Sequence, residues 1–567
     1  MTTTTPKPTG TGTTTASATT TASATTAPAS ATAPATAPAP AYTTDTTAPA
    51  TTATTPTADT TPAPTNTAIP TDTTPLRHLK VAIIGTGFSG LGTAIRLLQT
   101  GTDDFLLFER ANDLGGTWRD NTYPGCACDV MAHLYSFSFA PNPNWKSTFA
   151  TQTEVHTYLK DCAHRFGINP HIRYNHDLTA AHWDDTHHHW HLTTTGGTYT
   201  AQILVTGTGY LNEPAIPPIE GLDTFTGTIF HSSQWNHDHN LQGRNVAVIG
   251  TGASAIQFVP HIQPHVAHLD LYQRTPPWIG PKPDKPNTKL QTWLLRHLPG
   301  YQKLRRNFNK NGREILAFFL SRPTRTTGIH NMATKHLKKS VPDPTLRTQL
   351  TPDYTIGCKR LLFSNTWYPA IQQPNVTIIP TTIKNIGPTH ITTTDNTTRH
   401  IDTIILATGF QATNRPITHR IHGRNGTTLA TTWQNGMQAH RGTTIHGYPN
   451  LFMLLGPNTT LGHSSQTLII ESQINYLIHA LHTINKNNYT TIEPRQTAQT
   501  HYNNTLQQKI KHTVWTTNNC NSWYTDKNGN NTTIWPHTTH KFHKQTNHHD
   551  THNYQTTTHT THNNTNE

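Results

Sequence analysis

The chain carries the stretch KVAIIGTGFSGLGTAIRLL at residues 80–98. It opens with a short apolar run that predicts a buried strand, and it ends with apolar residues at helical spacing. Between them, Gly85, Gly87 and Gly90 form a GxGxxG turn in the strand-to-helix context of dinucleotide-binding folds. The first glycine makes the tight turn, the second admits a pyrophosphate, and the third lets the helix pack on the strand. The stretch therefore predicts an α/β fold with a phosphate at the N-terminus of a helix.

The next predicted strand, residues 105–108, ends in Glu109. Its distance from Gly85 is close to the roughly 20 residues that separate the glycine turn from the ribose-binding acid in such folds. A carboxylate there accepts hydrogen bonds from both ribose hydroxyls and repels a 2′-phosphate. This first site therefore favours an unphosphorylated adenosine ribose, as in FAD or NAD.

The same pattern recurs in the middle of the chain. A second strand leads into a GxGxxA turn that contains Gly250, Gly252 and Ser254, and the following strand ends in Arg274 and Thr275. A guanidinium makes bidentate, charge-assisted hydrogen bonds to phosphate, so this second site predicts NADP(H); the alternative is an ordinary surface arginine. Two sites of opposite ribose preference indicate a flavoprotein that receives hydride from NADPH.

The two ends of the chain differ from this core. Residues 1–75 are almost entirely Thr, Ala, Pro and Ser, and residues 541–567 are rich in Thr, His and Asn. Such segments bury too little apolar surface to offset their ordering entropy, so we expect both to be disordered. The N-terminal segment also lacks the apolar run of a secretory signal peptide, and it contains no Arg, unlike a mitochondrial presequence.

The overall composition excludes several classes of protein. Charged residues make up 13% of the chain and apolar residues 33%. No window approaches the roughly 18 to 20 consecutive apolar residues of a membrane helix, so we expect no integral membrane segment. The formal net charge is +12, but no block of five Lys or Arg exists, and we expect no nucleic-acid partner.

The five cysteines and 39 histidines predict neither a disulfide framework nor a metal centre. An odd, sparse set of cysteines in a long chain favours a reducing compartment, and we expect a cytoplasmic protein. Cys126 and Cys128 lack the second pair that a zinc site needs. In the run HHHWH at residues 187–191, side chains on a strand alternate between faces, so surface histidines are a better interpretation than metal ligands.

With these motifs, the chain resembles the class B flavoprotein monooxygenases, which include the Baeyer–Villiger monooxygenases and the flavin-containing N- and S-oxygenases. The resemblance covers roughly residues 78–540 and rests first on FTGTIFHSSQWN at residues 225–236. This segment is similar to the Baeyer–Villiger fingerprint FxGxxxHxxxW[P/D], except that Asn236 stands at the last position. The matching residues are Phe225, Gly227, His231 and Trp235. Trp235 favours the Baeyer–Villiger branch, since the N/S-oxygenases usually have Tyr there.

Two further motifs agree with this resemblance. The segment GGTW at residues 115–118 leads through YPG to Asp129, which matches the family's active-site aspartate, where the N/S-oxygenases tend to have Asn. The segment GCKR ends in Lys359 and Arg360; in the family, this Lys contacts the 2′-phosphate of NADPH and this Arg lies over the flavin. The resemblance also implies FAD contacts by the following residues: Gly116, Thr117, Trp118, Tyr135 and Asn458.

The resemblance implies an enzyme that uses FAD, NADPH and O₂ to insert one oxygen atom beside a ketone carbonyl, through a C4a-peroxyflavin, giving an ester or lactone. The cofactor supplies this chemistry, and the protein supplies placement and field. Arg360 would stabilise the anionic oxygen species, Asp129 would orient Arg360, and His231 would act in conformational change. Two alternatives stay open: an N- or S-oxygenase of the same fold, and a non-catalytic flavin-fold binding protein. The substrate and the oligomeric state are not predicted.

We expect two doubly wound, Rossmann-like α/β domains. The FAD domain is discontinuous, with residues 76–225 and 395–540, and the NADP domain spans residues 226–394. Within the NADP domain, residues 290–339 carry Leu, Arg and Lys at helical spacing and predict a helical insertion that lines the substrate cleft. The apolar run 404–410 predicts one further strand, which we assign to the FAD domain.

Overall fold

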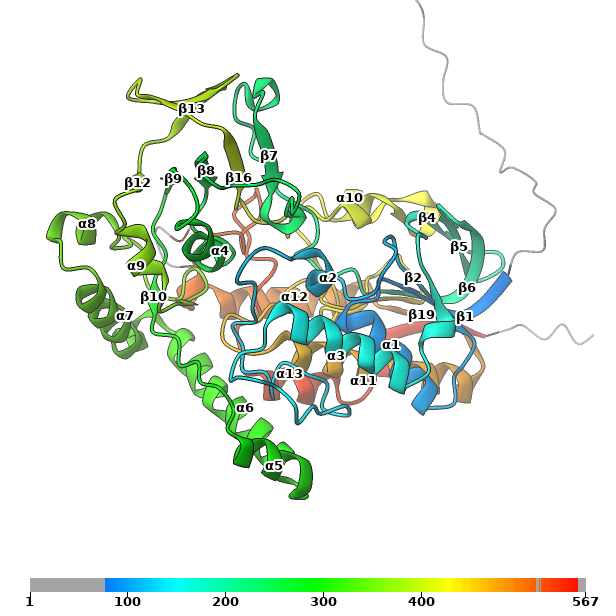
Figure 1. Cartoon of the computed structure of the whole chain (residues 1–567). Coiled ribbons are helices and arrows are strands. Elements are labelled where there is room, and N and C mark those ends of the chain that lie inside the picture. Colours follow the sequence, from blue (N-terminus) through cyan, green and yellow to red (C-terminus); the bar gives the residue numbers. More distant parts are fainter. Residues whose placement is uncertain (1–76, 517–519, 521, 559–567) are drawn as a thin grey trace, which may run out of the picture. The chain divides into compact units, whose positions relative to one another are not determined.

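The computed structural model describes residues 77–516, 520 and 522–558. The Thr-rich segment 1–75, predicted to be disordered, lies outside these residues. Two sheets with parallel central strands organise the described chain, which confirms the predicted α/β class with two Rossmann-like domains (Figure 1). Within the described ranges, no helix is long and apolar enough to cross a lipid bilayer.

The first sheet is built around β1 (Arg77–Ile84), whose apolar residues are fully buried. On one side β1 pairs in parallel with β2 (Phe105–Phe108), and on the other with β6 (Gly197–Thr206). The order of the strands in the described chain is β17-β4-β5-β6-β1-β2-β3, and β18 pairs with β6. The remaining strands are β3 (Ile172–Arg173), β4 (Leu178–Asp184), β5 (His189–Thr194), β17 (Ile421–His422) and β18 (Leu451–Met453). Helix α1 (Phe88–Gln99) follows β1 and packs against α3 (Gln152–Arg165) and α11 (Gln466–Asn487).

The second sheet is parallel throughout, with the order β12-β9-β8-β16-β7 in the described chain. Its strands are β7 (Thr228–His231), β8 (Asn245–Ile249), β9 (His268–Tyr272), β12 (Val376–Ile379) and β16 (Thr403–Leu406). Helices α4 (Ala255–Ile262) and α9 (Trp367–Ile371) pack against each other beside it.

The position of β16 corrects one predicted boundary. The sequence places everything from residue 395 onward in the FAD domain, but β16 lies between β7 and β8 in the second sheet. Its four residues are buried, as expected for a strand covered on both faces. The chain therefore returns to the first domain only after residue 406.

The predicted helical insertion consists of α5 (Lys289–His297), α6 (Tyr301–Leu320) and α7 (Thr327–Ser340), followed by α8 (Pro344–Gln349). In Figure 1, α5 and α6 extend away from the second sheet as a long hairpin. Two small sheets accompany this region. One pairs β10 (Ile279–Gly280) with β11 (Leu362–Phe363). The other contains β13 (Ile383–Gly387), β14 (His390–Thr393) and β15 (Thr398–His400).

The C-terminal region is folded further than the sequence predicts. The chain continues from β19 (Tyr489–Pro494) and α12 (Gln496–Ile510) into α13 (Thr539–Thr546) and β20 (Tyr554–Thr558). Phe542 and Tyr554 are buried at 0% and 2% exposure, and β20 pairs with β19. The predicted start of the tail at residue 541 is therefore wrong, because two aromatic side chains in a polar segment suffice to anchor it; residues 559–567 lie outside the described chain.

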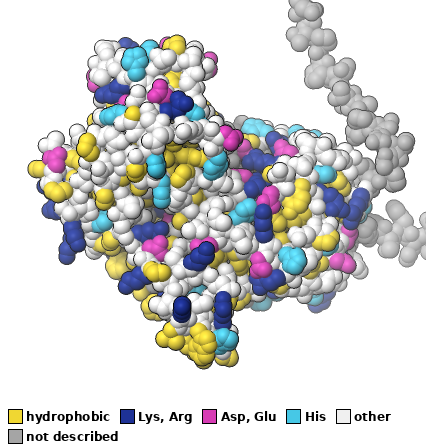
Figure 2. All heavy atoms as spheres, in the orientation of Figure 1, with side chains coloured by type: hydrophobic (Ala, Val, Ile, Leu, Met, Phe, Trp, Pro, Cys, Tyr) yellow, Lys and Arg dark blue, Asp and Glu magenta, His cyan; other side chains and the backbone are white. Residues whose placement is uncertain are grey.

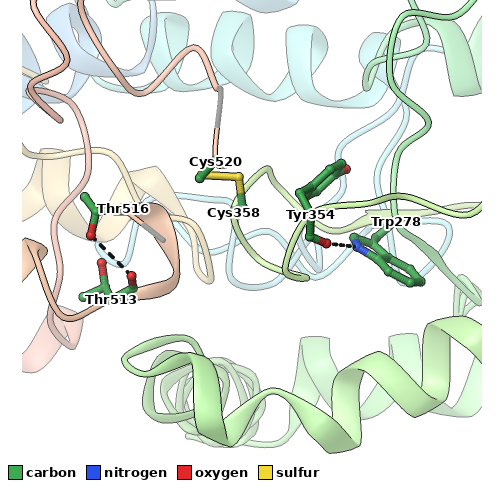
Figure 3. The surroundings of a disulfide bond; sticks show 6 residues. All are labelled: Trp278, Tyr354, Cys358, Thr513, Thr516 and Cys520. Atoms are coloured by element: carbon green, nitrogen blue, oxygen red, sulfur yellow. Dashed lines mark hydrogen bonds between the residues drawn. A yellow bond between two sulfur atoms is a disulfide. The ribbon is translucent and has the colours of Figure 1, made fainter. Parts of the chain in front are cut away.

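A disulfide joins Cys358 to Cys520 (Figure 3). The sequence predicts no disulfide, so this bond is a correction. The two cysteines lie 162 residues apart in the chain, and only the fold brings their Cα atoms to 5.5 Å. Cys126, Cys128 and Cys162 are free and buried.

Candidate functional site

The turn between β1 and α1 opens onto a deep cleft. Gly85 has φ +96°, a conformation that favours glycine, and a Cβ atom on Gly90 would lie 1.8 Å from the carbonyl oxygen of Gly85. The helix can therefore pack on the strand only because Gly90 has no side chain. The lining of the cleft runs from this glycine turn to Glu109, Trp118 and Arg415, so the cleft offers an extended surface to a ligand.

The far end of this cleft is marked by Glu109, which is only 4% exposed. One carboxylate oxygen accepts hydrogen bonds from the backbone N–H of Thr86 at 3.1 Å and from its hydroxyl at 2.6 Å. The other oxygen lies 2.6 Å from Nη1 of Arg119. These contacts hold the carboxylate at the edge of the cleft, where the sequence predicts a ribose contact.

The predicted FAD residues mostly line this cleft, and their chemistry fits an FAD molecule. The lining includes Gly85, Gly87, Glu109, Gly116, Thr117, Trp118 and Tyr135. Trp118 donates from its indole nitrogen to the hydroxyl of Tyr135 at 3.1 Å, which fixes both rings. Gly90 packs beneath the turn, and Asn458 donates to the carbonyls of Asn531 and Ile534, so these two residues lie outside the lining.

The second glycine turn, after β8, is more open. Gly250 has φ +107°, and a Cβ on it would lie 2.5 Å from the carbonyl oxygen of Ala407. At Gly252, by contrast, a Cβ would meet no atom within 4 Å, so the space above the turn is free for a ligand. Ser254 immediately precedes helix α4.

Two cations converge beside this second turn. Arg274, at the end of β9, is exposed, and Lys359 comes from the loop before β11. Partial burial and the nearby Arg274 guanidinium lower the pKa of Lys359. Two positive charges that repel each other bind a dianionic phosphate well, since the phosphate relieves their repulsion. Thr275 lies next to Arg274, and its carbonyl accepts from the hydroxyl of Thr251 at 3.4 Å.

The side chains of Asp129 and Arg360 form an ion pair, although the two residues lie 231 positions apart in the chain. Nε of Arg360 donates to one carboxylate oxygen at 2.7 Å and Nη2 donates to the other at 2.8 Å, which is the bidentate geometry. Burial disfavours the charge on Arg360, but Asp129 more than offsets it and raises the pKa of the guanidinium. The side chains are 32% and 29% exposed, so the pair remains accessible from the space around it.

The backbone around this ion pair is fixed on both sides. Cys128 and Val130, the neighbours of Asp129, are buried at 4% and 3% exposure. Gln257 of α4 ties this segment to the second domain, because its amide accepts from the N–H of Ala127 and donates to the carbonyl of the same residue. Arg360 follows Cys358, which is fully buried and held by the disulfide.

A small pocket lies against the ion pair. Asp129, Arg360, Arg313 and His463 supply its polar groups, and its other walls are largely apolar. The apolar lining comes from Leu316, Leu320, Ile329, Ile356, Leu361 and Phe363. The arrangement therefore places a fixed cation beside an apolar chamber, which suits a reaction that develops negative charge on a small organic molecule.

Known proteins with similar sequences decide the family. Over 480 residues the chain is 46% identical to a Baeyer–Villiger monooxygenase of Streptomyces coelicolor, and the match covers 84% of this chain and 92% of that protein. A Baeyer–Villiger monooxygenase of Pseudomonas aeruginosa is 47% identical over 471 residues, covering 82% of this chain and 89% of the relative. The chain belongs to the Baeyer–Villiger monooxygenase family. It is thus a flavoenzyme that uses FAD and NADP(H) as cofactors.

Two broader comparisons agree with the fold. A family model described as pyridine nucleotide-disulphide oxidoreductase matches residues 82–317. Among solved structures, oxidised steroid monooxygenase bound to NADP is 27% identical with a TM-score of 0.73, covering 83% of this chain and 97% of that chain. Cyclohexanone monooxygenase from Rhodococcus sp. Phi1 bound to NADP⁺ superposes with a TM-score of 0.77 at 24% identity, covering 85% of this chain and all of that structure, and so shows the shared fold.

The fingerprint of the Baeyer–Villiger family lies where the chain passes between the two sheets. A Cβ on Gly227 would lie 2.5 Å from the carbonyl oxygen of Asp402, so the glycine permits a close backbone approach. Phe225 and Phe230 are buried, and Trp235 packs edge-on against Phe230 at 5.1 Å. These residues build the connection and do not line either cleft described above.

His231 is the polar member of the fingerprint. It is 2% exposed, its Nδ1 interacts with the hydroxyl of Ser233 at 2.8 Å, and burial lowers the pKa of its ring. Its ring lies edge-on to Phe410 at 5.6 Å, at the end of β7. A neutral, buried imidazole at this junction is compatible with the predicted conformational role.

Sequence reasoning missed Arg313 in this monooxygenase. Its Nη2 donates to the backbone carbonyl of Asp129 at 3.2 Å, and it lines the small pocket. Burial lowers the pKa of Arg313; Asp129 opposes this effect, and the neighbouring Arg360 adds to it. The residue lies within the helical insertion that was predicted to line the cleft, but no local motif distinguishes it from the other arginines of α6.

The histidine run, interpreted from the sequence as surface histidines, contributes to a group of possible metal ligands. Although side chains of a strand alternate, the neighbouring strand contributes Asp184, and the ligand atoms of Asp184, His189 and His191 all lie within 4.8 Å of one another. This group sits on the β4–β5 hairpin, and none of its members lines the flavin cleft or the small pocket.

Proposed function

We propose that this enzyme inserts an oxygen atom beside the carbonyl of a small, mostly apolar ketone, with Arg360 as the catalytic cation. The bidentate Asp129–Arg360 pair carries the proposal, because it brings a permanently charged guanidinium to the wall of an apolar pocket. FAD, when bound and reduced by NADPH, supplies the activated oxygen. The side chains of the protein bind the nucleotides, orient the substrate and stabilise the charge that develops on it.

Arg360 holds positive charge where an oxygen anion develops on the substrate. A preorganised charge of this kind costs no reorganisation at the moment of reaction. Asp129 acts as a positioning residue, because it grips both Nε and Nη2 and leaves the outer edge of the guanidinium free. Arg313 adds a second cation beside the pocket and holds the backbone of Asp129 through the carbonyl oxygen of that residue.

The two nucleotides are held by separate groups. Gly85, Gly87, Glu109 and the segment from Gly116 to Trp118 would hold FAD in the deep cleft. Gly250, Gly252, Ser254, Arg274, Thr275 and Lys359 would hold NADPH, with its 2′-phosphate between Arg274 and Lys359. His231, at the junction of the two domains, would respond to nucleotide binding by a change of conformation, without accepting a proton from the substrate.

The lining of the pocket indicates the chemistry of the substrate. Leu, Ile and Phe side chains beside the Arg360 guanidinium suit an apolar molecule with one polar group. A ketone presents that group to Arg360. N- or S-oxygenation remains the second candidate, and Asp129, Arg360 and Trp235 favour the ketone because of their match to the Baeyer–Villiger motifs.

A product assay tests this proposal. The purified holoenzyme is incubated with NADPH, O₂ and an equimolar panel of cyclic ketones, linear ketones and sulfides, and the products are separated by mass. We expect esters or lactones from ketones as the main products. Sulfoxides without any ester would contradict the proposal and favour the N/S-oxygenase alternative, and a colourless protein without turnover would favour the non-catalytic alternative.

A cytoplasmic location belongs to the same proposal, because the reaction consumes NADPH. In a reducing compartment, the Cys358–Cys520 bond would be open or transient. Because Cys358 is fully buried in the folded protein, the producing cells are quenched in acid, the free thiols are alkylated in denaturant, and mass spectrometry tests this point. Mostly alkylated Cys358 supports the location, and a fully oxidised pair contradicts it.

A further inference from the structure

Exposed apolar side chains gather on the α5–α6 hairpin. Among the described residues, most of the large apolar side chains that are exposed belong to it, and the others are scattered. The exposed members on the hairpin are Leu290, Trp293, Leu298, Leu304, Phe308, Ile315, Phe318 and Phe319. Figure 2 shows apolar side chains at the tip of the molecule where Figure 1 places this hairpin, with Lys and Arg next to them. The patch is therefore local and amphipathic.

The apolar side chains of α6 form one stripe. Leu304, Phe308, Ile315 and Phe319 are spaced by four, seven and four residues, which puts them on one face of a helix. They are 65%, 72%, 60% and 37% exposed. In α5, Leu290 and Trp293 continue the exposed apolar surface at a spacing of three residues.

The opposite face of α6 is firmly attached to the protein. Nη1 of Arg306 donates to the carbonyls of Leu134 at 3.0 Å and Ser136 at 2.8 Å, and Arg313 reaches the carbonyl of Asp129. Asn309 and Leu320 are buried on this side. The helix therefore cannot turn its apolar stripe inward, and the stripe needs an external partner.

The charge of the hairpin identifies that partner. Residues 289–320 contain seven Lys and Arg but one acidic residue, Glu314, and that carboxylate accepts from the backbone N–H of Thr539 at 3.0 Å. Lys303 and Lys310 lie along one flank of the stripe, and Arg305 lies along the other. An apolar face between basic flanks has the pattern of a helix that lies in the interface of an anionic bilayer.

Two other partners fit less well. A second copy of the hairpin would bring like charges together across the contact. The N-terminal segment 1–75 has only Met1 and Ile69 as large aliphatic side chains and Tyr42 as its aromatic one, so its composition cannot cover such a stripe. We propose that the α5–α6 hairpin docks the enzyme on anionic lipid surfaces, with the apolar stripe in the acyl boundary and the lysines at the headgroups.

The docked position has a consequence for the substrate, which rests on the proposed function. The inner side of α6 contributes Arg313, Leu316 and Leu320 to the pocket beside Arg360. A helix whose outer stripe lies in the bilayer thus forms the wall of the reaction pocket. Apolar ketones that partition into lipid would reach the pocket at a higher local concentration than from water.

Vesicle binding tests the docking without relying on turnover. The full-length holoenzyme is sedimented with vesicles of phosphatidylcholine alone and of phosphatidylcholine mixed with phosphatidylglycerol, at low and high salt. We expect binding to the anionic vesicles that weakens with salt. The pair Leu304→Gln and Phe308→Gln should weaken it by at least about tenfold per residue, and Lys303→Gln with Lys310→Gln by roughly fivefold per lysine.

The matched control is Ile216→Gln, which removes another exposed large apolar side chain, 54% exposed, away from the hairpin. This variant should bind vesicles as the unmodified enzyme does, and all variants should keep their flavin absorbance. Failure of the unmodified enzyme to bind anionic vesicles overturns the docking proposal, as does binding that survives the double apolar substitution. A concentration-dependent dimer that the same double substitution abolishes, without vesicle binding, would assign the stripe to a second copy. Because the readout is sedimentation, it stays independent of whether the ketone activity is found.

A different observation, on the β4–β5 hairpin, carries a second inference. Asp184 is paired with His189, and His182 with His191, so these side chains share one face of the sheet. Nε2 of His191 lies 3.2 Å from Nε2 of His189 and 3.2 Å from Oδ2 of Asp184. In addition, Nδ1 of His187 lies 2.7 Å from the same carboxylate oxygen.

The two separations of 3.2 Å among Asp184, His189 and His191 are close to the edges of a metal coordination sphere. Ligands at about 2.0 to 2.1 Å around tetrahedral zinc lie about 3.4 Å from one another. The structure assigns a divalent transition-metal site to Asp184, His189 and His191, whose ligand atoms all lie within 4.8 Å of one another.

Zinc titration of the full-length protein against a chromophoric chelator tests this site. We expect the tightest zinc equivalent to disappear in the double variant His189→Asn and His191→Asn. The control is His390→Asn with His400→Asn, another cross-strand histidine pair, which lies outside the metal-ligand group found in the described chain. An unchanged titration in the first variant, or an equal loss in the control, overturns the assignment.

Discussion

The two nucleotide sites use nearly the same turn, yet they differ in how tightly the protein closes around them. At the first site the discriminating carboxylate, Glu109, is 4% exposed and held by Thr86 and Arg119. At the second site the discriminating cation, Arg274, is exposed, and the space above Gly252 is free. A closed site suits a cofactor that stays bound, and an open site suits a donor that must enter and leave. We expect the residue at the end of the following strand to select the nucleotide, and its burial to set how long the nucleotide stays bound.

The third position of each turn gives the largest expected effect. Gly90 packs so closely on the preceding turn that a Cβ atom on it would lie 1.8 Å from the carbonyl oxygen of Gly85. The second turn carries Ala255 at the same position. Gly90→Ala should therefore cost about 3 kcal/mol or more and leave the protein without flavin. The ratio of flavin absorbance to protein measures this, with Ala255→Gly as the control. Normal flavin content in Gly90→Ala would remove the difference between the two turns.

Arg360 lies beyond both nucleotide turns and should affect chemistry more than binding. Removing one preorganised charge that faces a developing anion costs roughly 2.7 to 4 kcal/mol, which is about 100- to 1,000-fold in rate. Arg360→Ala should therefore form product 100- to 1,000-fold more slowly and still bind FAD, because Arg360 does not line the flavin cleft. Product formation under saturating NADPH gives the measurement. A loss of flavin together with product would show a structural role instead.

Arg274 tests the open site alone. Charge-assisted contacts to the 2′-phosphate contribute about 1.5 to 3 kcal/mol. Arg274→Ala should raise the KM for NADPH by roughly 10- to 150-fold and leave the KM for NADH nearly unchanged. Steady-state kinetics with both donors provides the comparison, and Arg165→Ala, at the end of α3 in the first domain, serves as an arginine control. Equal use of NADH and NADPH by the unmodified enzyme would contradict the phosphate assignment.

Deleting residues 1–70 should have the smallest effect. Their composition includes almost no side chain that could add to a core, so neither nucleotide site should lose a contact. Flavin content and turnover should stay within experimental error of the full chain. An aggregated or colourless truncated protein would instead show that this segment packs on the enzyme.

Local sequence could predict the parts that depend on neighbouring residues. The strand, the glycine turn and the helix at residues 80–98 follow from apolar spacing and from three glycines. Glu109 and Arg274, which we predict to contact the ribose or its phosphate, each follow the next strand, as the sequence indicates. The pairing of Asp129 with Arg360 is predicted only through the resemblance to family motifs, and the structure brings the two side chains into contact.

The remaining features depend on partners that lie far away in the chain. The sequence of β16 identifies a buried strand but not its sheet, because parallel neighbours come from distant segments. Cys358 and Cys520 meet only after the fold is complete. Phe542 and Tyr554 anchor the polar C-terminal region. They are two aromatic residues in a stretch of Thr, His and Asn, so composition alone predicts disorder there. Arg313 reaches Asp129 because α6 lies across the first domain.

The central claim is that hydride donation and oxygen chemistry reside in separate groups, with Arg274 in the first and Arg360 in the second. The most direct measurement is oxygenated product per NADPH consumed, with hydrogen peroxide titrated in parallel, for the unmodified enzyme, Arg274→Ala and Arg360→Ala. At saturating NADPH, Arg274→Ala should keep the ratio of the unmodified enzyme. Arg360→Ala should still consume NADPH while the ratio falls toward zero and peroxide accumulates. A normal ratio in Arg360→Ala, or an equal loss in both variants, would contradict this account.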